Sequence, residues 1–403
     1  MLSRSKRPLL AAFALCGVLA GCGEPGAEPI GIDAAAVKGE AAVAPFEINA
    51  AVYWNEVARE MVMTNRSPAP VAIRGYALVS VAQYNAAAAA EGGHAQSDHP
   101  SVRAAIGAAS VEVLAYLYPA AEAALEARLV AFLGNAGRPG TQHENIGNGE
   151  SIGRAAAELV IDRAKTDLFF QPGVLTVPTG PGVWFSAAPP VGSRWGEART
   201  WFVESVAALR PPAPPAFGSA AFNADLAEAR QISDNRTPEQ SALAVYWDGA
   251  PGTVTPPGIW NEEAAELAIR YRLSDLAAAH LFALANMVSY DAIVSSHAAK
   301  YHYWLLRPTM ADPLITTAIP LPNFPSYPSN HAAVSAGMAR ILGDRFPAER
   351  ARLDALAEEA AFSRVLGGIH YRFDGDAGVA LGRAIADVAL AQDVSGRRPF
   401  ELD

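Results

Sequence analysis

Alanine-rich stretches with helical apolar periodicity fill most of this chain, and they constrain the fold more than any other feature. Trp54, Val57 and Met61 recur at spacings of three and four residues, which puts apolar side chains on one face of a helix. Alanine is the strongest helix former, and no segment alternates apolar and polar side chains as a half-buried strand does. Similar helical stretches cover residues 72–90, 101–117, 119–134, 150–165, 261–304, 330–342, 348–366 and 376–392. The sequence therefore predicts an all-α protein built from helical bundles.

Length and charge limit the classes of partner. The 403 residues are 51% hydrophobic, enough for a sizeable core in one large or two ordinary domains. The formal net charge of -10 argues against nucleic acid as a partner. A local cluster of cations would stand out against this acidic background.

The N-terminus has the features of a targeting segment. A basic start with Arg4, Lys6 and Arg7 precedes an apolar run that is too short to span a bilayer. The run ends in Leu-Ala-Gly-Cys at Cys22, which resembles the lipobox of bacterial lipoproteins; an ordinary signal peptide is the alternative. We expect residues 1–21 to be removed and the protein to be exported to the bacterial cell envelope, touching membrane only through lipid on Cys22. No thiol would then remain for a disulfide or a zinc site.

Composition and helical pattern divide the chain after residue 21 into regions. Residues 22–46 are small and rich in Gly, Ala and Pro, as in a flexible tether. Residues 47–235 are expected to form an N-terminal helical domain. Within it, residues 166–218 are dense in Pro, Gly and aromatics and should form an ordered excursion packed over helices. Residues 236–403 are expected to form the catalytic helical bundle, with Thr237 capping its first helix.

Two cations stand close together in an apolar setting. Lys300 and Arg307 are seven residues apart, which would put them on one face of a helix, and Pro308 places Arg307 near a helix end. Two cations on a solvated face are the alternative. The neighbouring Tyr301 and Trp304 favour burial.

Two further segments carry polar groups at helix boundaries. Ser329 stands where the cap of an Ala-rich helix is expected, and the amides that follow offer an anion site; a plain cap followed by a structural His331 is the alternative. Arg364 lies before a Gly-Gly break. His370 follows this break with Asp374 four residues later, and such a carboxylate fixes the tautomer of a histidine. A surface pair of little energetic value is the alternative.

Together, in this order, these segments resemble the superfamily of type 2 phosphatidic acid phosphatases and vanadium-dependent haloperoxidases. The matching positions are Lys300, Arg307-Pro308, Pro328-Ser329, His331, Ser363-Arg364, His370 and Asp374. Other positions are similar to bacterial vanadium chloroperoxidase-like proteins: Trp54-Asn55-Glu56, Trp195-Gly196, Thr237, Glu239-Gln240 and Trp260-Asn261. The resemblance covers about residues 48–390 and implies an oxyanion site in the core of the C-terminal bundle.

The resemblance implies which residues form the oxyanion cradle. The three cations Lys300, Arg307 and Arg364 would neutralise the oxygens of the anion. The Ser329 hydroxyl and the Asn330 amide would complete the cradle.

The resemblance also implies the catalytic roles. His370 would be the direct vanadium ligand of a haloperoxidase or the nucleophile of a phosphatase. His331 would be the acid–base group, Asp374 would orient His370, and Lys300 would polarise bound peroxide.

Three functions stay open from the sequence. The first is oxidation of halide by hydrogen peroxide to hypohalous acid, with vanadate as cofactor. The second is hydrolysis of a phosphomonoester through a phosphohistidine, without vanadate. The third is an inactive lipoprotein that binds an oxyanion or a lipid headgroup.

Three positions bear on specificity. Phe324 matches a phenylalanine of chloroperoxidases and would form an apolar wall for halide; a core phenylalanine is the alternative. Asn330 replaces the usual glycine, and asparagine tolerates left-handed backbone while its side chain narrows the pocket. His297 stands where chloroperoxidases carry tryptophan; it either adds a titrating group near the anion or faces solvent.

Overall fold

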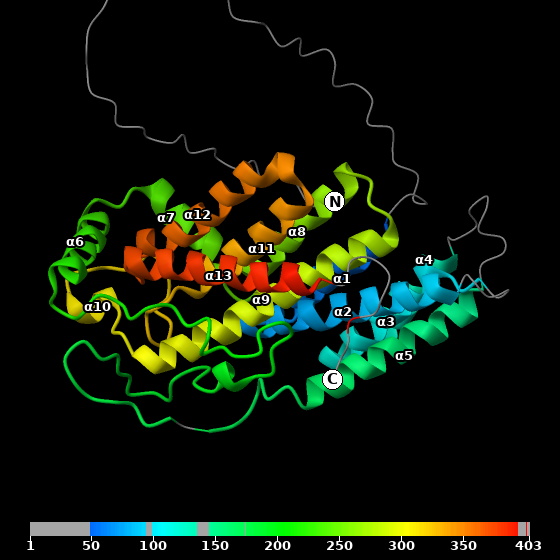
Figure 1. Cartoon of the computed structure of the whole chain (residues 1–403), viewed down its shortest axis with the longest axis horizontal. Helices are drawn as coiled ribbons and strands as arrows, with labels where there is room; N and C mark the ends of the chain where they lie inside the picture. The colour runs from blue at the N-terminus through cyan, green and yellow to red at the C-terminus, as the bar shows by residue number, and fades with distance from the viewer. Residues whose placement is uncertain (1–48, 94–98, 135–144, 174, 394–399, 401–403) are drawn as a thin grey trace, which may run out of the picture. The chain divides into compact units, whose positions relative to one another are not determined.

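The computed structural model describes residues 49–93, 99–134, 145–173, 175–393 and 400 (Figure 1). These residues contain thirteen α-helices and three short 3-10 helices, and within them β pairing is limited to isolated bridges. The all-α prediction is confirmed. The expected signal peptide, the lipid site at Cys22 and the tether lie outside the described residues.

The helices have these bounds: α1 Ala50–Thr64, α2 Ala69–Gly93, α3 Val102–Leu117, η1 Pro119–Ala121, α4 Glu122–Gly134, α5 Ile146–Lys165, η2 Trp195–Glu197, α6 Ala220–Asn235, α7 Pro238–Asp248, α8 Thr255–Arg270, α9 Asp275–Tyr303, α10 Pro308–Ala311, α11 Asn330–Arg345, η3 Pro347–Glu349, α12 Arg350–Leu366 and α13 Arg372–Gln392.

Side-chain caps set several helix starts. Thr237 and Gln240 form a capping box at α7, and the Ser329 hydroxyl accepts from the amide of Ala332 at α11, as predicted for both helices. The helical stretch expected over residues 261–304 is instead two helices. The break lies at Arg272, because its φ of 52° is incompatible with a continuing α-helix. Ser274 then caps the second helix. The pattern did not predict α6, which Ser219 caps.

Helix α9 is the central element of the fold. It packs against α2 on one side and against α11 and α13 on another, as Figure 1 shows. Among the described helices it is the one long and apolar enough to cross a membrane. However, 94% of its apolar 18-residue stretch is buried inside the protein. Its hydropathy is therefore explained by its place in the core.

Close packing of α13 on α11 positions the site. A Cβ added at Gly378 would lie 2.5 Å from the carbonyl oxygen of Ser329, and one at Gly382 would lie 2.1 Å from that of Ala333. Only glycine permits such an approach, so the start of α13 is held against the start of α11. The amide of Ser329 accordingly donates to the carbonyl of Asp374 at 2.9 Å.

The described residues of the excursion, 166–173 and 175–218, include segments that pack over α9. The carboxylate of Asp291 in α9 accepts from the backbone amides of Trp201, Phe202 and Val203 at 2.8–3.1 Å. Gly196 lies so close to α9 that an added Cβ would be 2.5 Å from the Cα of Ala298. Some of the aromatics of the excursion are buried, such as Trp184, and others stay exposed, such as Phe185.

The domain boundary placed at residue 235 stays a prediction. Residues Pro45–Asp403 form one compact unit. Helices from both sides of the boundary share a core, because α1 packs on α8 and α2 packs on α9.

Candidate active site

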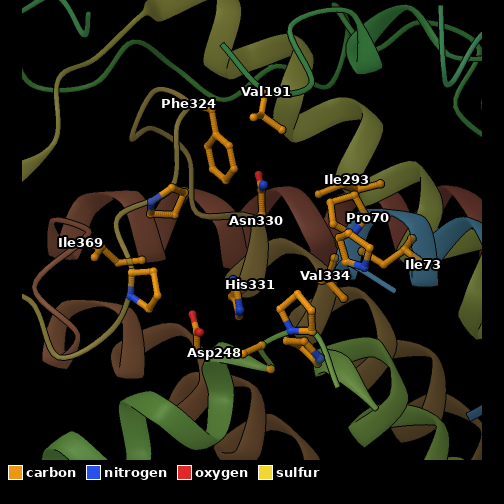
Figure 2. Close-up of a pocket in the computed structure, with 18 of the residues that line it drawn as sticks. Pro70, Ile73, Val191, Asp248, Ile293, Phe324, Asn330, His331, Val334 and Ile369 are labelled. Atoms are coloured by element: carbon orange, nitrogen blue, oxygen red, sulfur yellow. The ribbon is translucent and has the colours of Figure 1, made fainter. Parts of the chain in front are cut away.

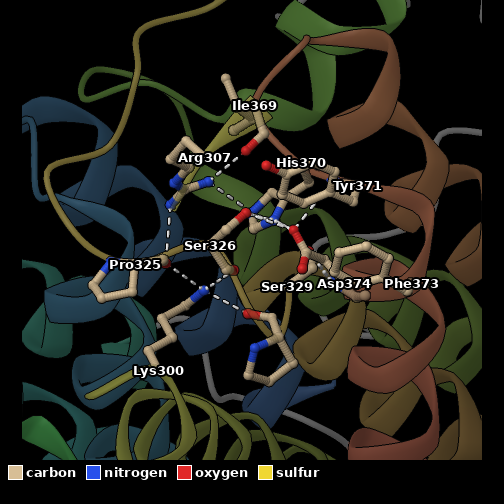
Figure 3. A network of polar contacts seen from close by, with 12 residues as sticks. Lys300, Arg307, Pro325, Ser326, Ser329, Ile369, His370, Tyr371, Phe373 and Asp374 are labelled. Carbon is tan, nitrogen blue, oxygen red and sulfur yellow. Dashed lines mark hydrogen bonds and ion pairs between the residues drawn. The ribbon is translucent and has the colours of Figure 1, made fainter. Parts of the chain in front are cut away.

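Three chain segments meet near the C-terminal end of α9. They are the residues after α9, the loop before α11, and the turn between α12 and α13 (Figure 3). Trp304 ends α9 in a left-handed conformation with φ of 52°, and the chain then runs extended to Arg307. Lys300 and Arg307 therefore do not share a helix face, contrary to the prediction. They meet at the site because the chain turns at Trp304.

Lys300 is fully buried and holds the loop before α11 in place. Its ammonium donates to the carbonyl oxygens of Pro325, Ser326 and Pro328 at 3.1, 2.6 and 2.5 Å. Burial and the nearby Arg307 lower the pKa of Lys300 well below its ordinary value. All three ammonium protons are donated in hydrogen bonds to carbonyl oxygens. Lys300 therefore places a positive charge at the site and also fixes the conformation of the loop.

Arg307 is fully buried as well and joins two of the segments. Its guanidinium donates to the carbonyls of Phe324 at 3.1 Å and Ile369 at 2.7 Å, and to Nε2 of His370 at 3.1 Å. Burial lowers the pKa of Arg307 to about 10. A cation thus donates a hydrogen bond to Nε2 of His370.

Arg364 approaches from α12. It donates to the carbonyl of Ala244 at 2.6 Å and pairs with the Asp248 carboxylate at 3.4 Å. Burial lowers the pKa of Arg364 to about 10. Burial also raises the pKa of Asp248, an effect that Arg364 opposes. Of the three cations, Arg364 is the one with an ion-pair partner among the described residues.

His370 is held in one tautomer. Its Nδ1 lies 2.7 Å from Oδ2 of Asp374, which also accepts from the Ser326 hydroxyl at 2.6 Å and from the Tyr371 amide at 3.1 Å. Nδ1 is therefore the protonated nitrogen, and Nε2 presents a lone pair toward Arg307. Burial, then Arg307 and Lys300, lower the pKa of His370 well below its ordinary value. The ring is neutral and its Nε2 can act as a ligand or a nucleophile.

His331 stands in the first turn of α11 with one nitrogen uncommitted. Its Nε2 is buried and has no hydrogen-bond partner among the described residues. The ring bonds instead to the backbone of Asp248 and Trp247, which leaves Nδ1 as the donor. Burial, followed by the charge of Arg364, lowers the pKa of His331 well below its ordinary value. Nε2 is thus a bare acceptor.

Asn330 and His297 form a buried pair. The Asn330 amide nitrogen lies 3.0 Å from His297 Nε2, and its oxygen accepts from Ser296 at 2.9 Å. His297 Nδ1 donates to the carbonyl of Gly192 at 3.1 Å. Burial lowers the pKa of His297 to about 3, so the ring stays neutral.

This pair corrects two expectations. His297 is fully buried, so the solvent-facing alternative is wrong. Asn330 is the first residue of α11, and its backbone is not left-handed. The tolerance of asparagine for left-handed backbone therefore plays no part here. The Asn330 side chain does face the cavity described next.

A cavity of about 420 Å³ is lined in part by His331 and His370 (Figure 2). Phe324 and Val191 lie on one side of it, and Asp248 and His331 on the other. The Phe324 ring covers two cations, with its centroid 5.3 Å from Lys300 Nζ and 5.1 Å from Arg307 Cζ. Its role as a halide wall stays a prediction.

The sequence analysis missed two residues of the site. Ser326 orients Asp374, and Asp248 pairs with Arg364 from α7, more than one hundred residues away in sequence. Ser326 lies three residues before Ser329, so a second hydroxyl beside the predicted helix cap was a signal that could have identified it. Nothing in the local sequence marks Asp248.

The site lies in the part of the chain that matches a known family. Residues 277–395 match the sequence profile of the PAP2 superfamily. This region is similar to the PAP2 superfamily. Lys300, Arg307, Ser329, His331, Arg364, His370 and Asp374 all lie inside it.

The chain is also similar to a protein of known activity. Over 141 residues the chain is 30% identical to vanadium chloroperoxidase from Curvularia inaequalis. The match covers 27% of this chain and 23% of that protein, so the chain spans less than a quarter of its relative.

Solved structures resemble the chain beyond the PAP2 region. A bacterial vanadium-dependent iodoperoxidase has a TM-score of 0.72 at 20% identity, covering 87% of this chain and 96% of that one. A holo-type bacterial vanadium-dependent chloroperoxidase has a TM-score of 0.63 at 14% identity, covering 84% and 96%. At such identities the likeness establishes a shared fold.

Proposed function

We propose that this chain is a vanadate-dependent haloperoxidase that oxidises halide with hydrogen peroxide to hypohalous acid. One observation carries the proposal: three fully buried cations surround a neutral His370 whose Nε2 lone pair is free of protons. Buried charges are costly unless they are paired, and only Arg364 has a carboxylate within ion-pair distance among the described residues. The site is therefore built to receive an anion.

Vanadate fits this donor set. His370 Nε2 would be its ligand, the charges of Lys300, Arg307 and Arg364 would neutralise its oxygens, and the Ser329 hydroxyl lies at the helix start beside them. When bound, vanadate supplies Lewis-acid activation of hydrogen peroxide without a change in its oxidation state.

The chain's own residues supply the proton chemistry. Nε2 of neutral His331 accepts a proton from hydrogen peroxide and returns it to the departing oxygen. Asp374 keeps the proton of His370 on Nδ1, so that Nε2 stays available. Phe324 excludes water above two cations and gives halide an apolar surface next to positive charge.

A phosphatase is the second candidate, because the same Nε2 is equally placed to attack phosphorus. His331 would then protonate the leaving alcohol. The fold likeness to bacterial haloperoxidases over more than 80% of the chain supports the first candidate over this one.

One preparation tests both candidates. Vanadate-loaded protein is mixed with hydrogen peroxide and iodide, bromide or chloride in turn, and vanadate-free protein is mixed with a phosphomonoester. We expect halide oxidation that tracks the vanadium content and no comparable release of phosphate. Phosphate release without oxidation of any halide would establish the phosphatase instead, and binding without either activity would leave the inactive lipoprotein.

Export and lipid attachment at Cys22 belong to the same proposal. They rest on the basic residues, the apolar run and the Leu-Ala-Gly-Cys sequence at the N-terminus. In cells given a radiolabelled fatty acid, the wild-type chain should be labelled and the Cys22→Ser variant should not.

A further inference from the structure

The turn between the end of α12 and His370 is pressed against a neighbouring loop. Helix α12 ends at Leu366, and Gly368 takes a left-handed conformation with φ of 76°. A Cβ added at Gly368 would lie 2.5 Å from the carbonyl oxygen of Thr316 and 3.0 Å from Nη2 of Arg236. Glycine at this position therefore lets the turn approach both the loop and a side chain from another helix.

Three carbonyl groups of this turn accept hydrogen bonds from three different segments. The pairs are Nε of Arg236 to Leu366 at 2.6 Å, the amide of Ala318 to Gly367 at 3.1 Å, and Nη1 of Arg307 to Ile369 at 2.7 Å. Arg307 belongs to the site itself (Figure 3), and Ala318 contributes only backbone. Of these donors, Arg236 is thus the one side chain that holds the turn from outside the site.

Arg236 also joins the turn to the loop beside it. Its Nη2 donates to the carbonyl oxygen of Thr316 at 2.7 Å, in the loop whose Ala318 amide holds Gly367. Among the described residues no carboxylate lies within ion-pair distance of Arg236. The rigid fork of the guanidinium suits two acceptors in a fixed arrangement. The side chain is therefore committed to the geometry of these two backbone segments.

The backbone of Arg236 is itself fixed at a corner between helices. It ends α6, and the next residue, Thr237, caps α7. Helix α7 then reaches Arg364, whose guanidinium donates to the carbonyl of Ala244. The corner and α7 thus contact α12 at Leu366 and at Arg364, although they lie outside the region 277–395 that matches the PAP2 profile.

We propose that Arg236 is a positioning residue, which fixes the turn that presents His370 Nε2 to the site. The inference rests on the proposed function, in which this nitrogen binds vanadate. Without Arg236, two buried-side carbonyls lose their donor and the turn is free to shift. Ile369 and His370 follow the turn directly, so the two hydrogen bonds that they accept from Arg307 would be misaligned together.

Vanadate affinity, measured by calorimetry, tests the role of Arg236 without turnover. Arg236→Met removes both donors and keeps the aliphatic stem. In Arg236→Gln the amide nitrogen takes the place of Nε, so it can donate to Leu366 but does not reach Thr316. The control is Arg350→Met at the opposite end of α12, where Arg350 donates to the carbonyl of Gly343 at 3.2 and 3.3 Å.

The variants should form a graded series. Residues that orient a metal ligand typically contribute 10–100-fold to metal affinity, so the vanadate Kd should rise about tenfold or more in Arg236→Met. The rise should be smaller in Arg236→Gln, and Arg350→Met should bind as the wild type does. Equal Kd values for Arg236→Met and the wild type would overturn the inference. If Arg236→Met does not fold, Arg236→Gln decides.

A spectroscopic measurement separates positioning from a general loss of stability. In vanadate-free protein labelled with 15N-histidine, the Nδ1 proton that His370 shares with Asp374 gives a resonance that disappears in His370→Ala. This resonance should shift or broaden in Arg236→Met and stay unchanged in Arg350→Met. An unchanged resonance in folded Arg236→Met would show that Arg236 does not act through His370. Failure of the wild type to oxidise any halide would overturn the proposed function, while the resonance would still decide the role of Arg236.

Discussion

The buried cations beside the cavity, called the floor below, and the wall of the cavity are built by different forces. The floor consists of Lys300, Arg307 and Arg364, each bound to carbonyl oxygens from distant segments. These cations do not line the cavity themselves, but Arg307 contacts its lining residue His370 and Arg364 pairs with its lining residue Asp248. The wall consists mainly of prolines and aliphatic side chains in van der Waals contact. Hydrogen bonds depend on direction and packing depends on volume, so the floor should tolerate almost no change and the wall should tolerate conservative ones.

The largest difference should appear on replacing His370. His370→Ala removes the Nε2 lone pair, and we expect halide oxidation to fall on the order of 10³-fold or more. The exposed His302→Ala is the control and should keep full activity. Initial rates with iodide measure both variants. Substantial activity in His370→Ala would show that the floor does not carry the chemistry.

Anion binding should stabilise the folded protein, because the positive charges of the floor are not all balanced by carboxylates. A tetrahedral oxyanion at one hundred times its Kd should raise the free energy of unfolding by about 2.7 kcal/mol. Arg364→Gln should weaken binding by about tenfold, which removes about 1.4 kcal/mol of this gain. The surface variant Arg383→Gln should keep it. Denaturant titration with and without vanadate measures the difference, and equal gains in both variants would remove Arg364 from the cradle.

The acid limit of activity should depend on Ser326. Burial raises the pKa of Asp374 to about 6, and the Ser326 hydroxyl opposes this by bonding to the carboxylate. Below that pKa the protonated carboxyl no longer holds the proton of His370 on Nδ1, so activity should fall as pH decreases through it. Ser326→Ala removes a bond worth about 1 kcal/mol, so the fall should move to higher pH, by on the order of one unit. A pH–rate profile that does not move would show that Ser326 has no part in orienting Asp374.

An effect on stability is expected at the Asn330–His297 pair, where Asn330 lines the cavity. His297→Phe leaves the Asn330 amide nitrogen without its buried acceptor and should cost about 1–2 kcal/mol of stability. Adding Asn330→Gly should recover part of this loss, because the unpaired amide is then gone. Denaturant midpoints of the two single variants and the double variant measure the coupling, and strictly additive losses would contradict it.

Much of the fold followed from local sequence. Periodicity and caps predicted the starts of α7 and α11 because these depend on side chains within three residues of the helix end. The break between α8 and α9 was missed because one residue, Arg272, adopts a left-handed conformation that its type does not favour. Helix α6 was missed although Ser219 caps it, since it is polar on average and only two of its residues are buried.

The proposed oxyanion pocket shows the same division between local sequence and tertiary structure. The sequence named its cations and histidines because their order and spacing resemble the pattern of the haloperoxidase and phosphatase superfamily. Tertiary structure alone decided that the Lys300 ammonium holds three loop carbonyls, that Asp248 faces Arg364, and that His297 is buried against Asn330. These contacts join residues 25 to 116 positions apart, so they depend on how helices pack and leave no trace in local periodicity.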